Sequence, residues 1–278
     1  MSEFEKLKVV TRYELLKQFR RRRFHGVLAI TILAVVLTIG LYKGLDLPGR
    51  MQQNIPEQMR IPDSAELFAI FVTSMGSLAI LGAVFFAGDA IASEFERKTG
   101  YILFPNPVKR ITLVVGKYLA CLIATAAILI IAYLISVGAL LAFYGQVPVG
   151  VLGSLAIALM LACCVISMAF AFSSVLKGGM GATIATLLTY MVVFSIISMS
   201  LSYAGYDPWF MPDRAGDAMT ATYGISLEQA FGGRMGGGPL GGMLRASQDP
   251  TLSFLVLLAY AIVLFQLSIW VTKRREMV

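Results

Sequence analysis

The sequence predicts an all-α, polytopic membrane protein with six transmembrane helices, an N-terminal amphipathic interfacial helix and both ends in the cytoplasm. Three observations predict this fold. The 278 residues are 58% hydrophobic and only 14% charged, with a mean hydropathy of +0.77, whereas a soluble domain carries about 25% charged residues. Six apolar stretches are each long enough to cross the roughly 30 Å of hydrocarbon in a bilayer. Basic residues are concentrated on one side of these stretches.

Residues 1–24 are predicted to form a cytoplasmic amphipathic connecting helix and not a span. Apolar and basic residues alternate there, as Phe4, Leu7, Lys6 and Lys8 illustrate, which suits a helix in the membrane interface. Four arginines then precede the first apolar stretch, and we interpret them as a topology and interface anchor. These residues are Arg20, Arg21, Arg22 and Arg23.

Residues 25–278 are predicted to form the transmembrane domain. Between the second and third spans lies a charged loop, residues 91–112, and before the last span lies a long, Gly-rich extracytoplasmic loop, residues 202–250. Lys117 lies near one end of the third span, where its ammonium group can reach the interface. The predicted spans are about 25–42, 66–90, 113–143, 149–176, 180–203 and 251–272.

The distribution of basic residues predicts the orientation. With the N-terminus inside, the inner segments hold 17 of the Lys and Arg residues and the outer segments hold six. This bias predicts an N-in, C-in protein of the cell membrane that crosses it several times. The net charge of +7 is explained by these helix-end residues, because the chain has no zinc spacing or aromatic RNA motif to support nucleic-acid binding.

Few residues in the predicted spans could carry chemistry. Asp89 and Gln266 are the polar candidates, and the single histidine, His25, lies at the interface. An ion-driven carrier needs a charged coupling site near the midplane, and an intramembrane metalloprotease needs a motif such as HExxH. Neither is present, so no metal or cofactor is expected. The three cysteines, Cys121, Cys163 and Cys164, are expected to be packing residues.

The sequence also has no G-x-x-x-x-G-K-[ST] phosphate-binding loop. The chain is therefore not expected to be an enzyme. If it moves a substrate uphill, the energy must come from a separate subunit.

The most distinctive segment is residues 88–119, which run from the second span into the third. Glu94 and Lys98 are four residues apart, in the favourable order for a helical ion pair, and Thr99-Gly100 would end that helix. Pro105 and Pro107 then impose an extended turn. Lys109-Arg110 and Gly116-Lys117 lead into the third span.

This order of residues resembles the permease subunits of type-2 ABC (ATP-binding cassette) transporters. The resemblance covers the layout of the whole chain, and the motif itself covers residues 88–119. It implies that the loop 91–112 carries a coupling helix that docks on an ABC ATPase. The other interpretation is that its charged residues only cap the second span and hold its topology. The docking candidates are Glu94, Phe95, Arg97, Lys98, Thr99 and Tyr101.

The resemblance also implies the partners. We expect two copies of an ABC ATPase subunit and a second permease chain, as homodimer or heterodimer, with spans two and five along the dimer axis. The implied function is the substrate pathway of an ATP-driven transporter, working as an exporter. The alternative is a membrane anchor or structural subunit that recruits an ATPase without moving a substrate. The substrate is not readable from the sequence.

The outer loop has its own alternatives. Its methionines, among them Met211 and Met219, could line a path for a soft metal such as Cu(I), or could be apolar material on interfacial helices. Residues 213–231 contain no proline and predict a helix, with Gly216 and Gly224 as its only breakers.

Overall fold

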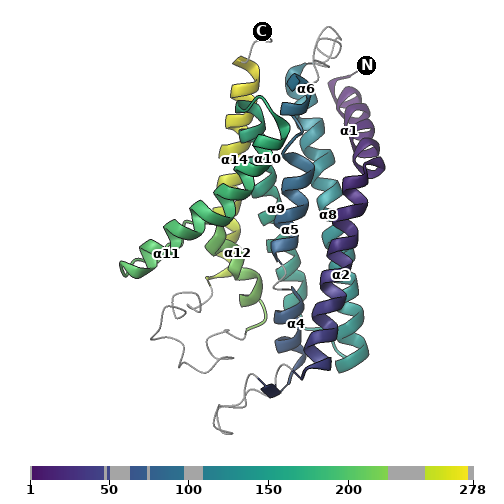
Figure 1. Ribbon diagram of the computed structural model, residues 1–278, viewed down its shortest axis with the longest axis vertical. Coiled ribbons are helices and arrows are strands. Elements are labelled where there is room, and N and C mark those ends of the chain that lie inside the picture. Colours follow the sequence, from purple (N-terminus) through teal and green to yellow (C-terminus); the bar gives the residue numbers. More distant parts are fainter. Residues whose placement is uncertain are drawn as a thin grey trace.

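A computed structural model describes residues 2–46, 49–50, 63–73, 76–96, 109–224 and 248–274. These residues form a bundle of helices, and no strand occurs among them, which confirms the predicted all-α class. The start of α1, the end of α14 and the short helix α6 lie at one end of the bundle (Figure 1). We call this end the α6 end. The helices are α1 (Glu3–Arg20), α2 (Arg22–Gly44), α4 (Ala65–Thr73), α5 (Gly76–Ala87), α6 (Ala92–Glu96), α8 (Arg110–Tyr144), α9 (Gly150–Val175), α10 (Gly179–Leu188), η2 (Thr189–Phe194), α11 (Ser195–Tyr203), α12 (Pro212–Ala221) and α14 (Pro250–Arg274).

Local sequence explains where several helices begin and end. Ser2 and Glu5 form a capping box that starts α1, since each side chain satisfies a backbone N–H of the other residue. Arg21 has extended backbone angles and separates α1 from α2. Gly145 adopts a left-handed conformation, with φ of 68°, and ends α8. Pro212 occupies the first turn of α12, where its missing N–H costs nothing.

Five helical segments of the described chain are long and apolar enough to cross a membrane. They are Arg22–Gly44, Ile111–Tyr144, Gly150–Val175, Gly179–Tyr203 and Pro250–Arg274, and they correspond to predicted spans one, three, four, five and six. The predicted second span, 66–90, is present as α4 and α5, of nine and twelve residues. Residues 74 and 75, which join the two helices in the sequence, lie outside the described ranges. The two helices follow one another along the bundle (Figure 1).

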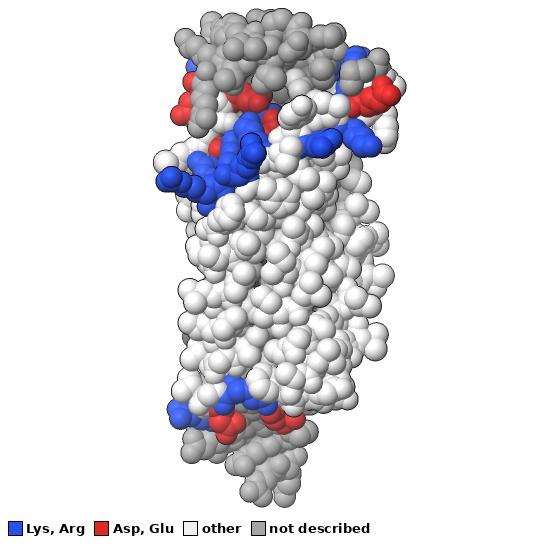
Figure 2. Space-filling model, turned by 90° about the vertical axis from the view of Figure 1, so that its right-hand side faces the viewer, with Lys and Arg blue, Asp and Glu red and all other residues white. Residues whose placement is uncertain are grey.

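Charged side chains are confined to the two ends of the face shown in Figure 2, and the broad belt between them is uncharged. This distribution is what a bilayer requires, because charged groups are expensive in hydrocarbon. The helix α8 is longer than the belt needs. Its 35 residues span about 52 Å at 1.5 Å per residue, so its first turns extend toward the α6 end, where α1 packs along them.

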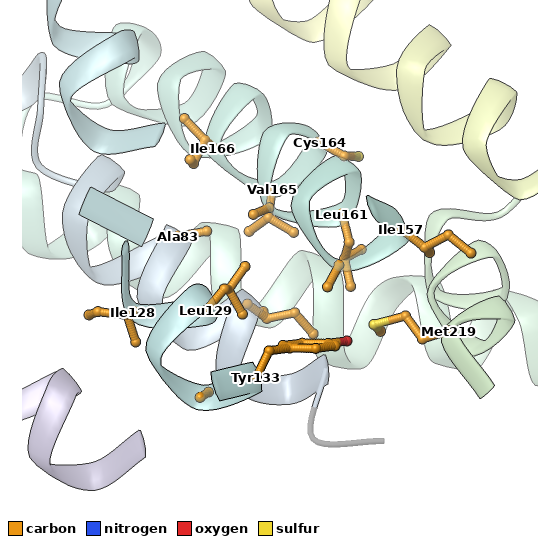
Figure 3. Packing of buried hydrophobic residues seen from close by; sticks show 14 of the residues in the cluster. Ala83, Ile128, Leu129, Tyr133, Ile157, Leu161, Cys164, Val165, Ile166 and Met219 are labelled. Atoms are coloured by element: carbon orange, nitrogen blue, oxygen red, sulfur yellow. The ribbon is translucent and has the colours of Figure 1, made fainter. Parts of the chain in front are cut away.

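The core is organised around α9. The most apolar stretch of α9 is 61% buried. The corresponding stretches of α14 and of the span formed by α10, η2 and α11 are each 17% buried. Figure 3 shows apolar side chains of α9 facing α5, α8 and α12. Tyr133 of α8 also shares a hydrogen bond of 2.8 Å with Ser154 of α9. The residues labelled there are Ala83, Ile128, Leu129, Tyr133, Ile157, Leu161, Cys164, Val165, Ile166 and Met219.

The fifth span departs from a regular α-helix. Its middle turn, η2, is a π-helix, and beyond it α11 runs away from the bundle (Figure 1). No residue of α11 is buried. Tyr190 of η2 is buried, and Gly216 of α12 approaches its hydroxyl closely, since a Cβ there would lie 3.3 Å from it.

In the outer loop the predicted helix 213–231 is only partly correct. The helix α12 ends at Ala221, and Gly224 has a φ of 72° that L side chains rarely adopt. Residues 225–231 lie outside the described ranges.

Candidate functional site

The short helix α6 is fixed to the bundle where it leaves α5. The backbone N–H groups of Ile91 and Ala92 both donate to the Ser173 hydroxyl of α9, at 3.1 and 2.9 Å. Ser173 is completely buried. One side chain of the central helix therefore satisfies two backbone donors at the start of α6, which otherwise have no helical partner.

Lys117 joins α6 to two other helices. Its ammonium nitrogen lies 2.7 Å from a Glu94 carboxylate oxygen of α6 and 2.8 Å from a Glu14 carboxylate oxygen of α1. The Lys117 side chain is 6% exposed, and those of Glu94 and Glu14 are 13% and 20% exposed. One cation of α8 is thus shared by two carboxylates that lie 80 positions apart in the sequence.

The Glu14 carboxyl responds to this arrangement. Burial raises its pKa, but the opposing attraction and hydrogen bond of the Lys117 ammonium, with a smaller contribution from Lys17, leave the pKa below its ordinary value of 4.5. Glu14 is therefore a carboxylate at neutral pH. Its charge therefore supports the ion pair with Lys117 at neutral pH.

A second ion-pair cluster lies beside the first. Asp89, which follows α5, is 8% exposed. Its carboxylate oxygens lie 2.7 Å from a guanidinium nitrogen of Arg23 and 3.5 Å from one of Arg21. Both arginines lie at the break between α1 and α2. Arg20 and Arg22 of the same run are exposed. The structure thus divides the predicted anchor: two arginines fix α1 and α2 to the end of α5, and two face outward.

The amide of Gln18 adds a further link between α1 and the bundle. It donates to the Phe86 carbonyl of α5 at 3.2 Å and to the Cys121 sulfur of α8 at 3.5 Å. Gln18 is buried. Together with the ion pairs, this contact fixes α1 along α8 and against the end of α5.

The start of α10 also meets α6. A Glu96 carboxylate oxygen accepts a hydrogen bond from the Gly179 N–H at 3.1 Å, and Gly178, the N-cap residue of α10, has no side chain to do so. A carboxylate at a helix N-terminus is favourable for the helix dipole. Glycines permit the close approach: a Cβ at Gly179 would lie 2.9 Å from the Asp89 Cβ, and one at Gly88 would lie 2.8 Å from the Thr183 Cα.

The opposite end of the bundle has its own polar cluster, centred on Asp63. This carboxylate accepts hydrogen bonds from the hydroxyls of Tyr42 and Tyr144 and from the Lys43 ammonium, at 2.5 to 3.0 Å. Burial raises the pKa of the Asp63 carboxyl, but these three donors outweigh it and leave the pKa below its usual value. The cluster ties the ends of α2 and α8 to the chain before α4.

The structure describes only part of the predicted docking set. Glu94 and Phe95 lie in α6, and the Glu94 side chain pairs with Lys117. The Phe95 side chain and residues Arg97, Lys98, Thr99 and Tyr101 lie outside what the structure describes, as does the expected Glu94–Lys98 pair. Docking by these residues therefore stays a prediction.

Several residues of the site were not predicted from the sequence. Glu14, Glu96 and Ser173 were not singled out, and Lys117 was interpreted only as a residue reaching the interface. A lone lysine seven positions into an apolar helix is itself a signal, because such a charge needs a partner. Its partners come from segments whose distance in space no local pattern encodes. Within the described ranges, no three His, Cys, Asp or Glu side chains are grouped as a metal site requires.

Comparison with known families gives one match. The sequence model of a family described as "ABC-2 family transporter protein" matches residues 9–277, nearly the full length. A search of curated proteins finds no match to the chain. The family match includes α1 from residue 9 onward, α6 and every described helix of span length.

Proposed function

The chain belongs to the ABC-2 transporter family, and on this premise we propose that it is the permease subunit of an ATP-driven exporter. In this proposal two permease chains form the substrate pathway, and two copies of a separate ABC ATPase drive it. Six spans cross the cell membrane, with α4 and α5 together forming the second. The α6 end faces the cytoplasm, as the excess of basic residues on that side favours.

The observation that carries the proposal is the set of attachments of α6. Through Lys117, Ser173 and Gly179 this five-residue helix is joined to α8, α9 and α10, and through Lys117 also to α1. It follows α5 directly along the chain. A push on so short a helix would therefore act on several spans at once, which is what a rigid-body conformational change needs.

The docking surface for the ATPase is proposed to continue from α6 into the following residues. The inward face of α6 is occupied by the Glu94–Lys117 pair. Contact with an ATPase therefore falls to residues beyond it, where Arg97, Lys98, Thr99 and Tyr101 lie in the sequence. Lys and Arg at this position would complement an acidic groove.

A second copy of a permease chain is proposed to lie against the fifth span. Apolar side chains of α11 are exposed on a helix that leaves its own bundle, among them Ile196 at 59% and Met199 at 46%. A span that contacts so little of its own chain is suited to pack against a partner.

A pull-down tests the ATPase contact. The permease is co-expressed with an ABC ATPase encoded beside it, solubilised in detergent and captured by a tag on the permease. Arg97→Glu combined with Lys98→Glu should abolish capture of the ATPase, because both substitutions reverse the charge of the docking surface. The matched control is Arg50→Glu combined with Arg60→Glu, which reverses two charges in a segment assigned to the opposite side and should leave capture unchanged.

Transport by reconstituted vesicles separates the two functions that the sequence leaves open. Vesicles that contain both subunits should accumulate a substrate when ATP is supplied, and mass spectrometry of co-purified molecules would provide the compounds to test. Capture of the ATPase without any ATP-dependent accumulation would favour the membrane-anchor alternative. Failure of the wild-type chain to capture an ATPase would contradict both.

A further inference from the structure

We propose that Lys117 is a positioning residue that ties α1 and α6 to the first turns of α8, so that the three helices move as one body. This inference rests on the proposed function, in which α6 receives the movement of an ATPase. It assigns to one buried ammonium group the task of passing that movement to α1 and to the third span.

The geometry supports a tether more than a surface ion pair. Lys117 is 6% exposed, and its nitrogen lies within 2.8 Å of both Glu14 and Glu94. Exposed ion pairs contribute little because water competes for both charges. A buried ammonium group that loses a partner is instead left poorly solvated, which is strongly unfavourable. Moving α6 away from α8 would leave the Lys117 ammonium group without the Glu94 carboxylate, which is energetically unfavourable. We therefore expect α8 to move together with α6.

Lys117 also provides a polar link between α6 and α8 that no other described residue provides. The helix α6 packs against α9 and α10. Among the hydrogen bonds and ion pairs of the described residues, the Glu94–Lys117 pair is the one that joins α6 to α8. The same ammonium reaches Glu14, so α1 and α6 contact a common charge.

The two carboxylates make the arrangement depend on the cation. Without Lys117, Glu14 and Glu94 would face each other as like charges across a space that held a cation. Like charges at short range in a poorly solvated place repel. Removal of Lys117 is thus expected to push α1 and α6 apart near this site and to remove the ion pairs that join each of them to α8.

Removal of Lys117 should not unfold the protein, because α1 has other contacts with α8. Gly116 lets Val10 approach closely, since a Cβ at Gly116 would lie 2.6 Å from the Val10 Cγ1. Gln18 keeps its bonds to Phe86 and Cys121. The experiment can therefore separate coupling from folding.

Two measurements on the full-length chain test the proposal. The first is hydrogen exchange of residues 92–96 and 3–20 in the purified permease alone. The second is ATP hydrolysis by the complex in nanodiscs, compared with the ATPase alone. Lys117→Met should raise exchange in both segments, leave ATPase capture unchanged, and lower the stimulation of hydrolysis about 2- to 30-fold, the range for mutations along a coupling network.

Matched variants make the result specific. Lys273→Met removes an exposed cation from the last turn of α14 and should alter neither measurement. Glu94→Gln should loosen α6 but not α1, and Glu14→Gln should loosen α1 but not α6. Lys117→Arg keeps the charge and should recover part of the stimulation. The triple variant Lys117→Met, Glu14→Gln, Glu94→Gln removes the repulsion between the carboxylates. Its hydrogen exchange should be lower than that of Lys117→Met alone, but its stimulation of ATP hydrolysis should stay as low.

Unchanged exchange in α6 and full stimulation in Lys117→Met would overturn the tether. An equal loss in Lys273→Met would also overturn it, because the effect would then follow from net charge. If the wild-type chain binds no ABC ATPase, the proposed function fails, yet hydrogen exchange of the permease alone still shows whether Lys117 joins the three helices.

Discussion

Arg23, in the first turn of α2, lies 2.7 Å from Asp89, and this contact fixes the start of α2 to the end of α5. Asp89 is the acceptor for Arg21 as well. The two arginines thus balance the charge of the Asp89 carboxylate, which is buried at the edge of the uncharged belt.

We predict that Asp89→Asn destabilises the protein. The amide cannot balance two guanidinium groups, and a carboxylate that is 8% exposed is part of a partly desolvated pair. Because Arg23 is 55% exposed, we expect a loss of about 1–2 kcal/mol in unfolding free energy, between the values for surface and buried pairs. Thermal unfolding in detergent measures it. Asp207→Asn, at a side chain that is 68% exposed, is the control and should change little.

Gly88→Ala is predicted to separate α5 from α10. The added Cβ would lie 2.8 Å from the Thr183 Cα, and backbone cannot move aside as a side-chain end can. Overpacking of this kind costs about 1–3 kcal/mol, which a shift in the midpoint of thermal unfolding would report. Gly181→Ala in α10 meets nothing within 4 Å and should be neutral or stabilising by up to about 1 kcal/mol. Equal effects from the two substitutions would contradict the close approach.

Glu96→Ala is predicted to fray the start of α10. The variant removes the carboxylate that accepts from the Gly179 N–H, and loss of a cap costs about 0.5–2 kcal/mol. Faster hydrogen exchange should be confined to the first turn of α10. Glu96→Gln keeps an acceptor but loses the charge that favours the helix dipole, so its effect should be smaller. Exchange that rises throughout α10 would indicate a packing role for Glu96 instead.

Acidification is predicted to loosen the contact between α1 and α8 at Glu14. Glu14 has a lowered pKa in the folded protein, so its contribution to stability is present above the ordinary pKa of 4.5 and is lost as the pH falls through the folded value. Spin labels on the exposed residues Arg12 of α1 and Ile123 of α8 would report the separation of the helices. In Glu14→Gln the distance should be independent of pH over this range. A pH response that persists in that variant would assign the effect to another group.

Helix class and most helix boundaries were predictable from this sequence, because long apolar runs bounded by charges permit few other structures in lipid. The predicted span 113–143 and the observed α8, Arg110–Tyr144, differ by only a few residues at each end. The π-turn at Thr189–Phe194 was not predicted, because its side chains are as apolar as those of the α-helices beside it.

The polar site was predictable only in part. The segment 88–119 was singled out from the sequence, and Glu94 lies in α6; its role in docking stays a prediction. The expected partner, Lys98, lies outside the described ranges, and the pair that the structure shows, with Lys117, was not predicted. Helical spacing predicts neighbours on one helix, whereas the contacts of Lys117 depend on how three helices assemble. Asp89 and the arginine run were both noted, yet their pairing depends on the same assembly.

The π-turn in the fifth span also has a consequence for evolution. A π-turn accommodates one residue more than an α-turn, and each residue rotates an α-helix by about 100°. The insertion therefore turns every side chain of α11 relative to those of α10. One half of the span can keep the face that fits its own bundle while the other half presents a different face outward. Substitutions in α10 and α11 are thereby subject to separate constraints, and deletion of one residue between 189 and 194 would couple them again.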